Sequence, residues 1–118
     1  MKGAYALHVH GRVSEVPRET WDACVGASGS PFVEHTWLDC FEEAGCVGDE
    51  DEDHAAAWRP AHLALYEGKT LVALAPSYFK TNSEGEFIFD WAWADLARRI
   101  GIRYYPKVLV ASPFSPVT

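Results

Sequence analysis

The sequence lacks the motifs that would assign a catalytic centre or a metal site directly. Its three cysteines, Cys24, Cys40 and Cys46, contain no pair at zinc-ligand spacing. An odd number of cysteines without a C-x-x-C motif is typical of a protein from a reducing compartment. Nothing in the chain resembles a nucleophile elbow. We therefore expect no disulfide, no bound metal and no serine-hydrolase site, and we expect Cys24 and Cys40 to pack as small apolar side chains.

Long apolar runs and clusters of positive charge are also missing. The longest apolar run, LVALAP, is far too short to span a bilayer, and the N-terminus has no signal-peptide pattern. These features predict a cytoplasmic protein without a membrane span. Seventeen acidic residues outnumber ten basic ones, which gives a formal net charge of −7. Because phosphate binding requires clustered Lys and Arg, we expect this chain not to bind nucleic acid.

The N-terminal half contains enough apolar sequence for a core, in patterns that predict a strand and two helices. The chain has 118 residues, 48% of them hydrophobic, which suits one ordinary domain. Alternation over residues 5–10 predicts a half-buried strand. Residues 17–25 follow as a short helix, and residues 31–44 as an amphipathic helix capped by Ser30 and ended by Gly45. The acidic run 49–53 is typical of a solvated loop rather than a cation site.

The C-terminal half reads as a β-meander followed by one more helix and strand. The segment AHLALYEGKTLVALAPSYFK (61–80) forms a hairpin with its turn at 67–69, and Pro76 indicates a strand edge or bulge. The segment EFIFDW (86–91) is the third strand, with Phe87, Phe89 and Trp91 on one face and Ile88 and Asp90 on the other. A short helix at 94–100 and a buried strand at 107–111 follow. We expect an α/β (α+β) fold with a mixed, mostly antiparallel sheet and two N-terminal helices.

The most distinctive group of polar and aromatic residues is Asp90, Trp91, Trp93 and Asp95. Aromatic rings can stack on a flat or sugar-like group while a carboxylate accepts a proton from an amine or hydroxyl, which suits a substrate-binding wall. The structural alternative is a core turn in which the rings pack inward and one aspartate caps the next helix. The sequence leaves both readings open.

A second group, Tyr104, Tyr105 and Lys107, follows shortly afterwards. These side chains could hold an anionic group of a substrate. Equally, they could begin a strand, with tyrosine rings half-buried and their hydroxyls in water. His35 and Asp39 stand at the helical spacing used by some metal sites, but two ligands do not make a site. The catalytic residues stay unassigned.

Three segments of the chain resemble one known family when taken together. They are SPFVEHTWLDCFEEAGCVG, RPAHLALYEGKTLVALAPSYFK and EFIFDWAWADLARRIGIRYYPKVLVASPFSPVT, and they cover nearly all of residues 32–118. They resemble the N-terminal part of the FemAB-like family of the GNAT acyltransferase superfamily, which is described as acting in peptidoglycan biosynthesis or recognition. The most specific blocks are residues 89–95 and 104–107; the acidic run 49–53 departs from the pattern.

The resemblance implies a transferase that moves an acyl or aminoacyl group to an amine in peptidoglycan or cell-wall metabolism. It implies a small-molecule or peptidoglycan-precursor substrate at the two groups above, and acyl-CoA or aminoacyl-tRNA as donor in the full-length family. The Gly-rich turn that binds acyl-CoA in that superfamily has no counterpart in residues 1–118. We therefore expect an incomplete GNAT-like domain with no cofactor site, inactive alone, whose exposed strand edge near 107–111 permits homo-oligomers. The alternatives are a non-catalytic recognition module or an inactive truncated fragment.

Overall fold

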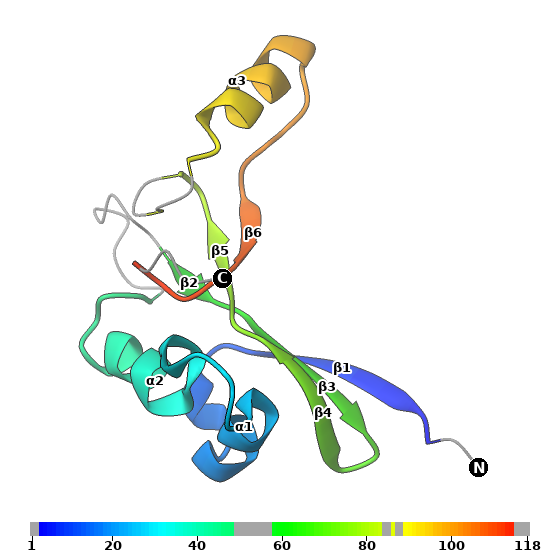
Figure 1. Ribbon diagram of the computed structural model, residues 1–118. Helices are drawn as coiled ribbons and strands as arrows, with labels where there is room; N and C mark the ends of the chain where they lie inside the picture. The colour runs from blue at the N-terminus through cyan, green and yellow to red at the C-terminus, as the bar shows by residue number, and fades with distance from the viewer. Residues whose placement is uncertain (1–2, 49–57, 84–85, 87–88, 115–118) are drawn as a thin grey trace.

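The computed structural model describes residues 3–48, 58–83, 86 and 89–114, which form a mixed α+β fold (Figure 1). This confirms the expected fold class. The acidic run 49–53 and residues Phe87 and Ile88 lie outside the described part. In chain order the strands and helices are β1 (Tyr5–His10), α1 (Arg18–Val25), α2 (His35–Glu43), β2 (Arg59–Pro60), β3 (His62–Glu67), β4 (Thr70–Ala75), β5 (Ser77–Lys80), α3 (Trp91–Ile100) and β6 (Lys107–Val110), with short 3-10 turns η1 (Val13–Glu15) and η2 (Pro31–Val33).

The strands are divided between two antiparallel sheets, where the sequence suggested one. The order is β1-β3-β4 in the first sheet and β2-β5-β6 in the second. Strands β2 and β3 run antiparallel to β4 and β5 as one long hairpin, interrupted at Ala61 and Pro76. At this interruption the Ala61 N–H donates to the Ser77 carbonyl. Pro76 therefore marks the point where the chain passes from one sheet to the other, and β5 beyond it is a strand that the sequence reading merged into the hairpin.

Helices α1 and α2 lie on one side of the first sheet and build the larger core (Figure 1). That core consists of apolar side chains from η1, the segment after it, both helices and the sheet: Val13, Val16, Trp21, Leu38, Ala64 and Leu71. Strand β1 contributes little to this core. All of its residues are exposed except His10, which is partly buried, and the apolar side chains of Tyr5, Leu7 and Val9 are each about 60% exposed. The expectation of a half-buried β1 is therefore wrong: the strand forms, but at the sheet edge and away from the helices.

The predicted helix 31–44 is split into η2 and α2. The Ser30 hydroxyl accepts a hydrogen bond from the Phe32 amide, as expected of a cap. The chain then becomes extended at Glu34, and the His35 amide donates to Asp22 Oδ1 of α1 at 2.9 Å. A tertiary contact with α1 thus begins α2 one turn later than the local pattern predicts. Cys24 and Cys40 are exposed rather than packed, which corrects their expected role.

The segment predicted as a third meander strand is not a strand at its described positions. Asp90 is the residue before α3, and Trp91 is the first residue of that helix. Helix α3 is longer than expected and ends at Gly101, whose φ of 77° lies in the left-handed region that glycine adopts without strain. It stands at one end of the molecule, away from α1 and α2 (Figure 1). Among the described residues no helix is long and apolar enough to cross a membrane.

Strand β6 is paired with β5 only, among the residues described, and so lies at the edge of its sheet, where the sequence placed an edge. It is less buried than expected, since Val108 and Val110 are both more than half exposed. Self-association through this edge stays a prediction.

Candidate functional site

Lys107, at the start of β6, is the centre of a polar cluster that joins three segments of the chain. Its Nζ donates to Glu86 Oε1 at 2.8 Å, to Asp90 Oδ2 at 2.5 Å and to Ser83 Oγ at 3.0 Å. An ammonium group has three hydrogens, so these three acceptors satisfy it completely. The Lys107 side chain is only 12% exposed, and its partners raise its pKa in spite of its burial. We call this set, with the residues added below, the Lys107 cluster.

Lys80, at the end of β5, extends the cluster inward. Antiparallel pairing places Lys80 opposite Lys107, and Lys80 Nζ donates to Glu86 Oε2 at 2.7 Å. Glu86 therefore bridges two lysines with its two oxygens, and its side chain is 6% exposed. The Lys80 ammonium also lies 4.3 Å from the centre of the Trp58 ring. Burial lowers the pKa of Lys80, although Glu86 opposes this shift.

Asp90 is the acidic residue of the cluster that has an oxygen free to accept a further hydrogen bond. Its Oδ2 accepts from Lys107 and from the Tyr104 hydroxyl at 2.6 Å, which raises the pKa of Tyr104. Burial favours the neutral form of Asp90, but the hydrogen bonds from Lys107 and Tyr104, together with the nearby Ser83 hydroxyl, outweigh it and lower its pKa to about 2. Its Oδ1 is buried and has no hydrogen-bond partner among the described residues. Although Asp90 occupies the N-cap position of α3, its side chain makes no capping bond.

The two tyrosines line the same cluster. The Tyr104 and Tyr105 rings meet edge to face at 5.1 Å, and Lys107 Nζ lies 5.9 and 5.8 Å from their centres. The Tyr105 hydroxyl is hydrogen-bonded to Ser83 Oγ. Four residues singled out from the sequence are thus brought together here: Asp90, Tyr104, Tyr105 and Lys107.

The other three residues singled out from the sequence lie outside the Lys107 cluster. Trp91 is 51% exposed and stacks on Phe89, with ring centres 6.4 Å apart. Trp93 is 67% exposed. Asp95 forms ion pairs with Arg98 and Arg99 on the surface of α3. Whether these three contact a substrate stays a prediction.

Sequence reasoning missed Lys80, Ser83 and Glu86. Ser83 and Glu86 stand in the polar segment where the predicted hairpin gives way to the predicted third strand, whose first residue is Glu86, and neither was considered as a site residue. The one available signal was that a lysine precedes this polar segment and another begins the final strand. That signal becomes informative only once β5 and β6 are known to pair.

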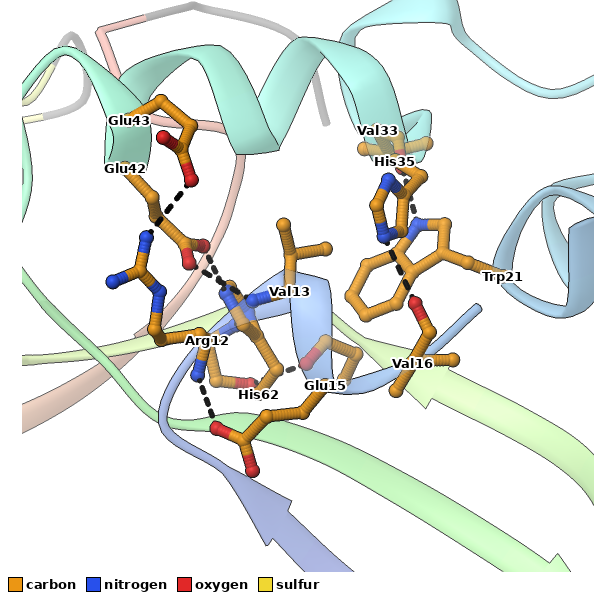
Figure 2. A network of polar contacts seen from close by, with 12 residues as sticks. Arg12, Val13, Glu15, Val16, Trp21, Val33, His35, Glu42, Glu43 and His62 are labelled. Atoms are coloured by element: carbon orange, nitrogen blue, oxygen red, sulfur yellow. Dashed lines mark hydrogen bonds and ion pairs between the residues drawn. The ribbon is translucent and has the colours of Figure 1, made fainter. Parts of the chain in front are cut away.

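A second polar cluster is buried between α2 and the sheets and is structural in character (Figure 2). Glu42 Oε1 accepts from the Val13 amide at 2.9 Å, and Glu42 Oε2 lies 3.0 Å from His62 Nε2. The Ser77 amide donates to His62 Nδ1, so Nε2 carries the hydrogen that Glu42 accepts. Both side chains are almost fully buried, and burial together with the nearby Glu42 charge raises the pKa of Tyr78.

Neither cluster contains a set of metal ligands among the residues that the structure describes. In the described ranges no group of three His, Cys, Asp or Glu side chains is placed to hold an ion. His35 instead pairs its Nε2 with the Val16 carbonyl at 2.9 Å (Figure 2).

Comparison with known families gives a match over almost the whole chain. Residues 12–118 match the model of the FemAB-like family, described as peptidoglycan biosynthesis/recognition. The chain therefore belongs to the FemAB-like family. Comparison with curated proteins and with solved structures found no significant match.

Proposed function

We propose that this chain provides the acceptor-side contacts of a GNAT-type acyl- or aminoacyl-transferase that acts on an amine of a peptidoglycan precursor. The observation that carries the proposal is Asp90 Oδ1, a buried acceptor without a described partner in a cluster whose other charged groups are satisfied. Buried polar atoms are nearly always paired, so an unpaired one is a natural position for a ligand donor. The ammonium of an acceptor substrate is a donor of that kind.

The hydrogen bonding of the Lys107 cluster favours a donor group on the ligand over an anionic group. The two lysines are balanced in charge by Glu86 and Asp90, and their ammonium groups already have acceptors, so only the unpaired Asp90 oxygen is left to bind a ligand. Asp90 is ionised at neutral pH because its pKa is about 2. It therefore attracts an amine or hydroxyl hydrogen, and the idea that Lys107 and the tyrosines hold a substrate anion is less favoured.

The low pKa also limits what Asp90 does chemically. A general base is most effective when its pKa lies near the working pH. A carboxylate with a pKa of about 2 holds and orients an ammonium group but removes its proton poorly. We assign Asp90 to binding, with Tyr104 fixing its orientation through the 2.6 Å hydrogen bond.

The aromatic pair beside the cluster extends the surface toward a sugar-like group. Phe89 is 68% exposed and stacks with Trp91, immediately before and after Asp90 in the chain. Exposed ring faces suit the apolar face of a sugar, and Asp90 lies between them in sequence. A peptidoglycan fragment offers both a sugar and an amine.

A recognition module without catalysis is the second candidate. The observation that favours it is the same low pKa of Asp90, which leaves the Lys107 cluster with a binding carboxylate and without an assigned base. The two candidates share the binding site and differ in turnover. Acylation of the fragment on incubation with the chain and acyl-CoA or aminoacyl-tRNA would exclude the module. Binding without product is expected of both candidates, because residues 1–118 contain no counterpart of the Gly-rich donor turn.

Calorimetric titration with a muropeptide fragment that carries a free amine tests the binding site. Asp90→Asn should weaken binding about tenfold, because a hydrogen bond to a charged group is lost. Glu43→Gln, which alters an exposed carboxylate that pairs with Arg12 outside the Lys107 cluster, is the control and should leave affinity unchanged. The N-acetylated fragment should bind as weakly to wild type as the free-amine fragment binds to Asp90→Asn. Equal affinity for the two fragments would contradict the proposal.

A further inference from the structure

Helix α3 presents an apolar stripe to solvent. Trp93, Leu96 and Ile100 are 67%, 46% and 60% exposed. At about 100° per residue these three side chains fall within one narrow sector of the helix, while Asp95 and Arg98 fall on the far side and Arg99 lies at the flank of the stripe. A surface helix of a globular domain normally turns such a stripe toward the core. Nothing in the described part of the chain covers this stripe.

Charge is distributed unevenly between α3 with its flanks and the remainder of the chain. Residues 89–107 carry four basic and two acidic side chains, whereas the rest of the chain carries six basic and fifteen acidic ones. Arg98 and Arg99 are 80% and 74% exposed, and Arg103 is also exposed. The end of the molecule that carries α3 is therefore its positive end (Figure 1).

We propose that α3 is an interfacial helix that lies on the surface of an anionic lipid bilayer. Trp93, Leu96 and Ile100 would enter the boundary between headgroups and acyl chains, where indole rings are favoured. Arg99, at the flank of the stripe, would remain at the level of the lipid phosphates, with its apolar stem along the surface. The stripe excludes Asp90 and Lys107, so the proposal stands independently of the proposed substrate site.

Other occupants of the stripe fit less well. Three side chains bury far less than the roughly 800 Å² per partner of a stable protein interface, and a second copy would bring two positive ends together. Nucleic acid needs a row of free cations beside its backbone, whereas Arg98 and Arg99 are both paired with Asp95. A bilayer needs neither a large complementary area nor a row of unpaired cations.

Cosedimentation with vesicles tests the proposal. The chain should bind vesicles of phosphatidylglycerol mixed with phosphatidylcholine, and binding should weaken with added salt and with phosphatidylcholine alone. Leu96→Ser should weaken binding about fivefold, from the lost burial of one partly exposed leucine. Leu7→Ser, which removes a 63% exposed leucine from β1, is the matched control and should change nothing. Trp93→Gln provides a second stripe variant, and circular dichroism verifies that each variant is folded.

Three results would overturn the proposal. The first is equal loss of binding in Leu7→Ser and Leu96→Ser, which would indicate general stickiness. The second is absence of binding to the anionic vesicles. The third is a concentration-dependent dimer, or binding of a short RNA, that Leu96→Ser abolishes while vesicle binding is unaffected.

Discussion

Glu42→Ala is expected to lower the free energy of unfolding by about 3–5 kcal/mol. Its carboxylate accepts from the Val13 amide and from His62 Nε2, and both donors are buried and have no other acceptor among the described residues. Each orphaned buried donor costs about 1–3 kcal/mol. The carboxylate also joins three segments, since His62 in turn accepts from the Ser77 amide. Urea unfolding followed by tryptophan fluorescence measures the loss, because Trp21 packs edge to face on His62 at 5.5 Å.

The neighbouring glutamate provides the control. Glu43 pairs with Arg12 at 3.1 Å on the surface, where its side chain is 66% exposed, so Glu43→Ala should cost less than about 1 kcal/mol. Glu42→Gln should also destabilise, because its amide offers one acceptor oxygen to two donors while Nδ1 of His62 is already occupied. Similar losses for Glu42→Ala and Glu43→Ala would mean that the buried pair does not hold these segments together.

Asp90→Asn is expected to lower the free energy of unfolding by about 1–2 kcal/mol at pH 7. It should also make the free energy of unfolding less dependent on pH in the acid range. This loss follows from the lowering of the pKa of Asp90 from 3.8 to about 2, reduced by solvent screening because the side chain is 18% exposed. A carboxyl whose pKa is lowered by folding stabilises the folded state above the unfolded pKa and loses that contribution as pH falls through the folded pKa. The difference between wild type and Asp90→Asn should therefore shrink between about pH 4 and about pH 2.

Asp95→Asn is the control that shows whether the loss of stability is specific to Asp90. It removes a different carboxylate, which lies on α3 itself. Asp95 is 37% exposed and lies among arginines at the surface, so its replacement should cost well under 1 kcal/mol at every pH. Urea unfolding at several pH values measures all three proteins. A difference between wild type and Asp90→Asn that stays constant with pH would show that Lys107 and Tyr104 do not stabilise the ionised carboxyl.

Local patterns in the sequence predicted most elements of the fold but not their arrangement. The cap at Ser30, the stop at Gly101 and the hairpin turn at Gly68 depend on nearby residues and were found. The break at Glu34 was not, because it depends on Asp22 of another helix. The division into two sheets was also missed, since it follows from pairing partners beyond Ala61 and Pro76.

The candidate site was predictable in part for the same reason. Asp90, Tyr104 and Lys107 stand close in the chain and attracted attention by their residue types. Lys80 enters only through its pairing opposite Lys107, and Glu86 through its two lysine partners. Such long-range contacts leave no periodic signal in one sequence. The alternation of apolar and polar residues in β1 was misleading. It predicted a half-buried strand, but β1 lies at the edge of its sheet and is mostly exposed.

Two-dimensional NMR of the isotope-labelled chain, titrated with the free-amine muropeptide fragment, tests the substrate site most directly. The account predicts that the largest amide shifts occur at Ser83, Asp90 and Tyr105, with little change at Glu42 and His62 in the buried second cluster. The same titration of Asp90→Asn should give weaker shifts at those positions. Shifts that cluster around β1 or α1, or the absence of any shift at saturating fragment, would contradict the assignment of the Lys107 cluster as the binding site.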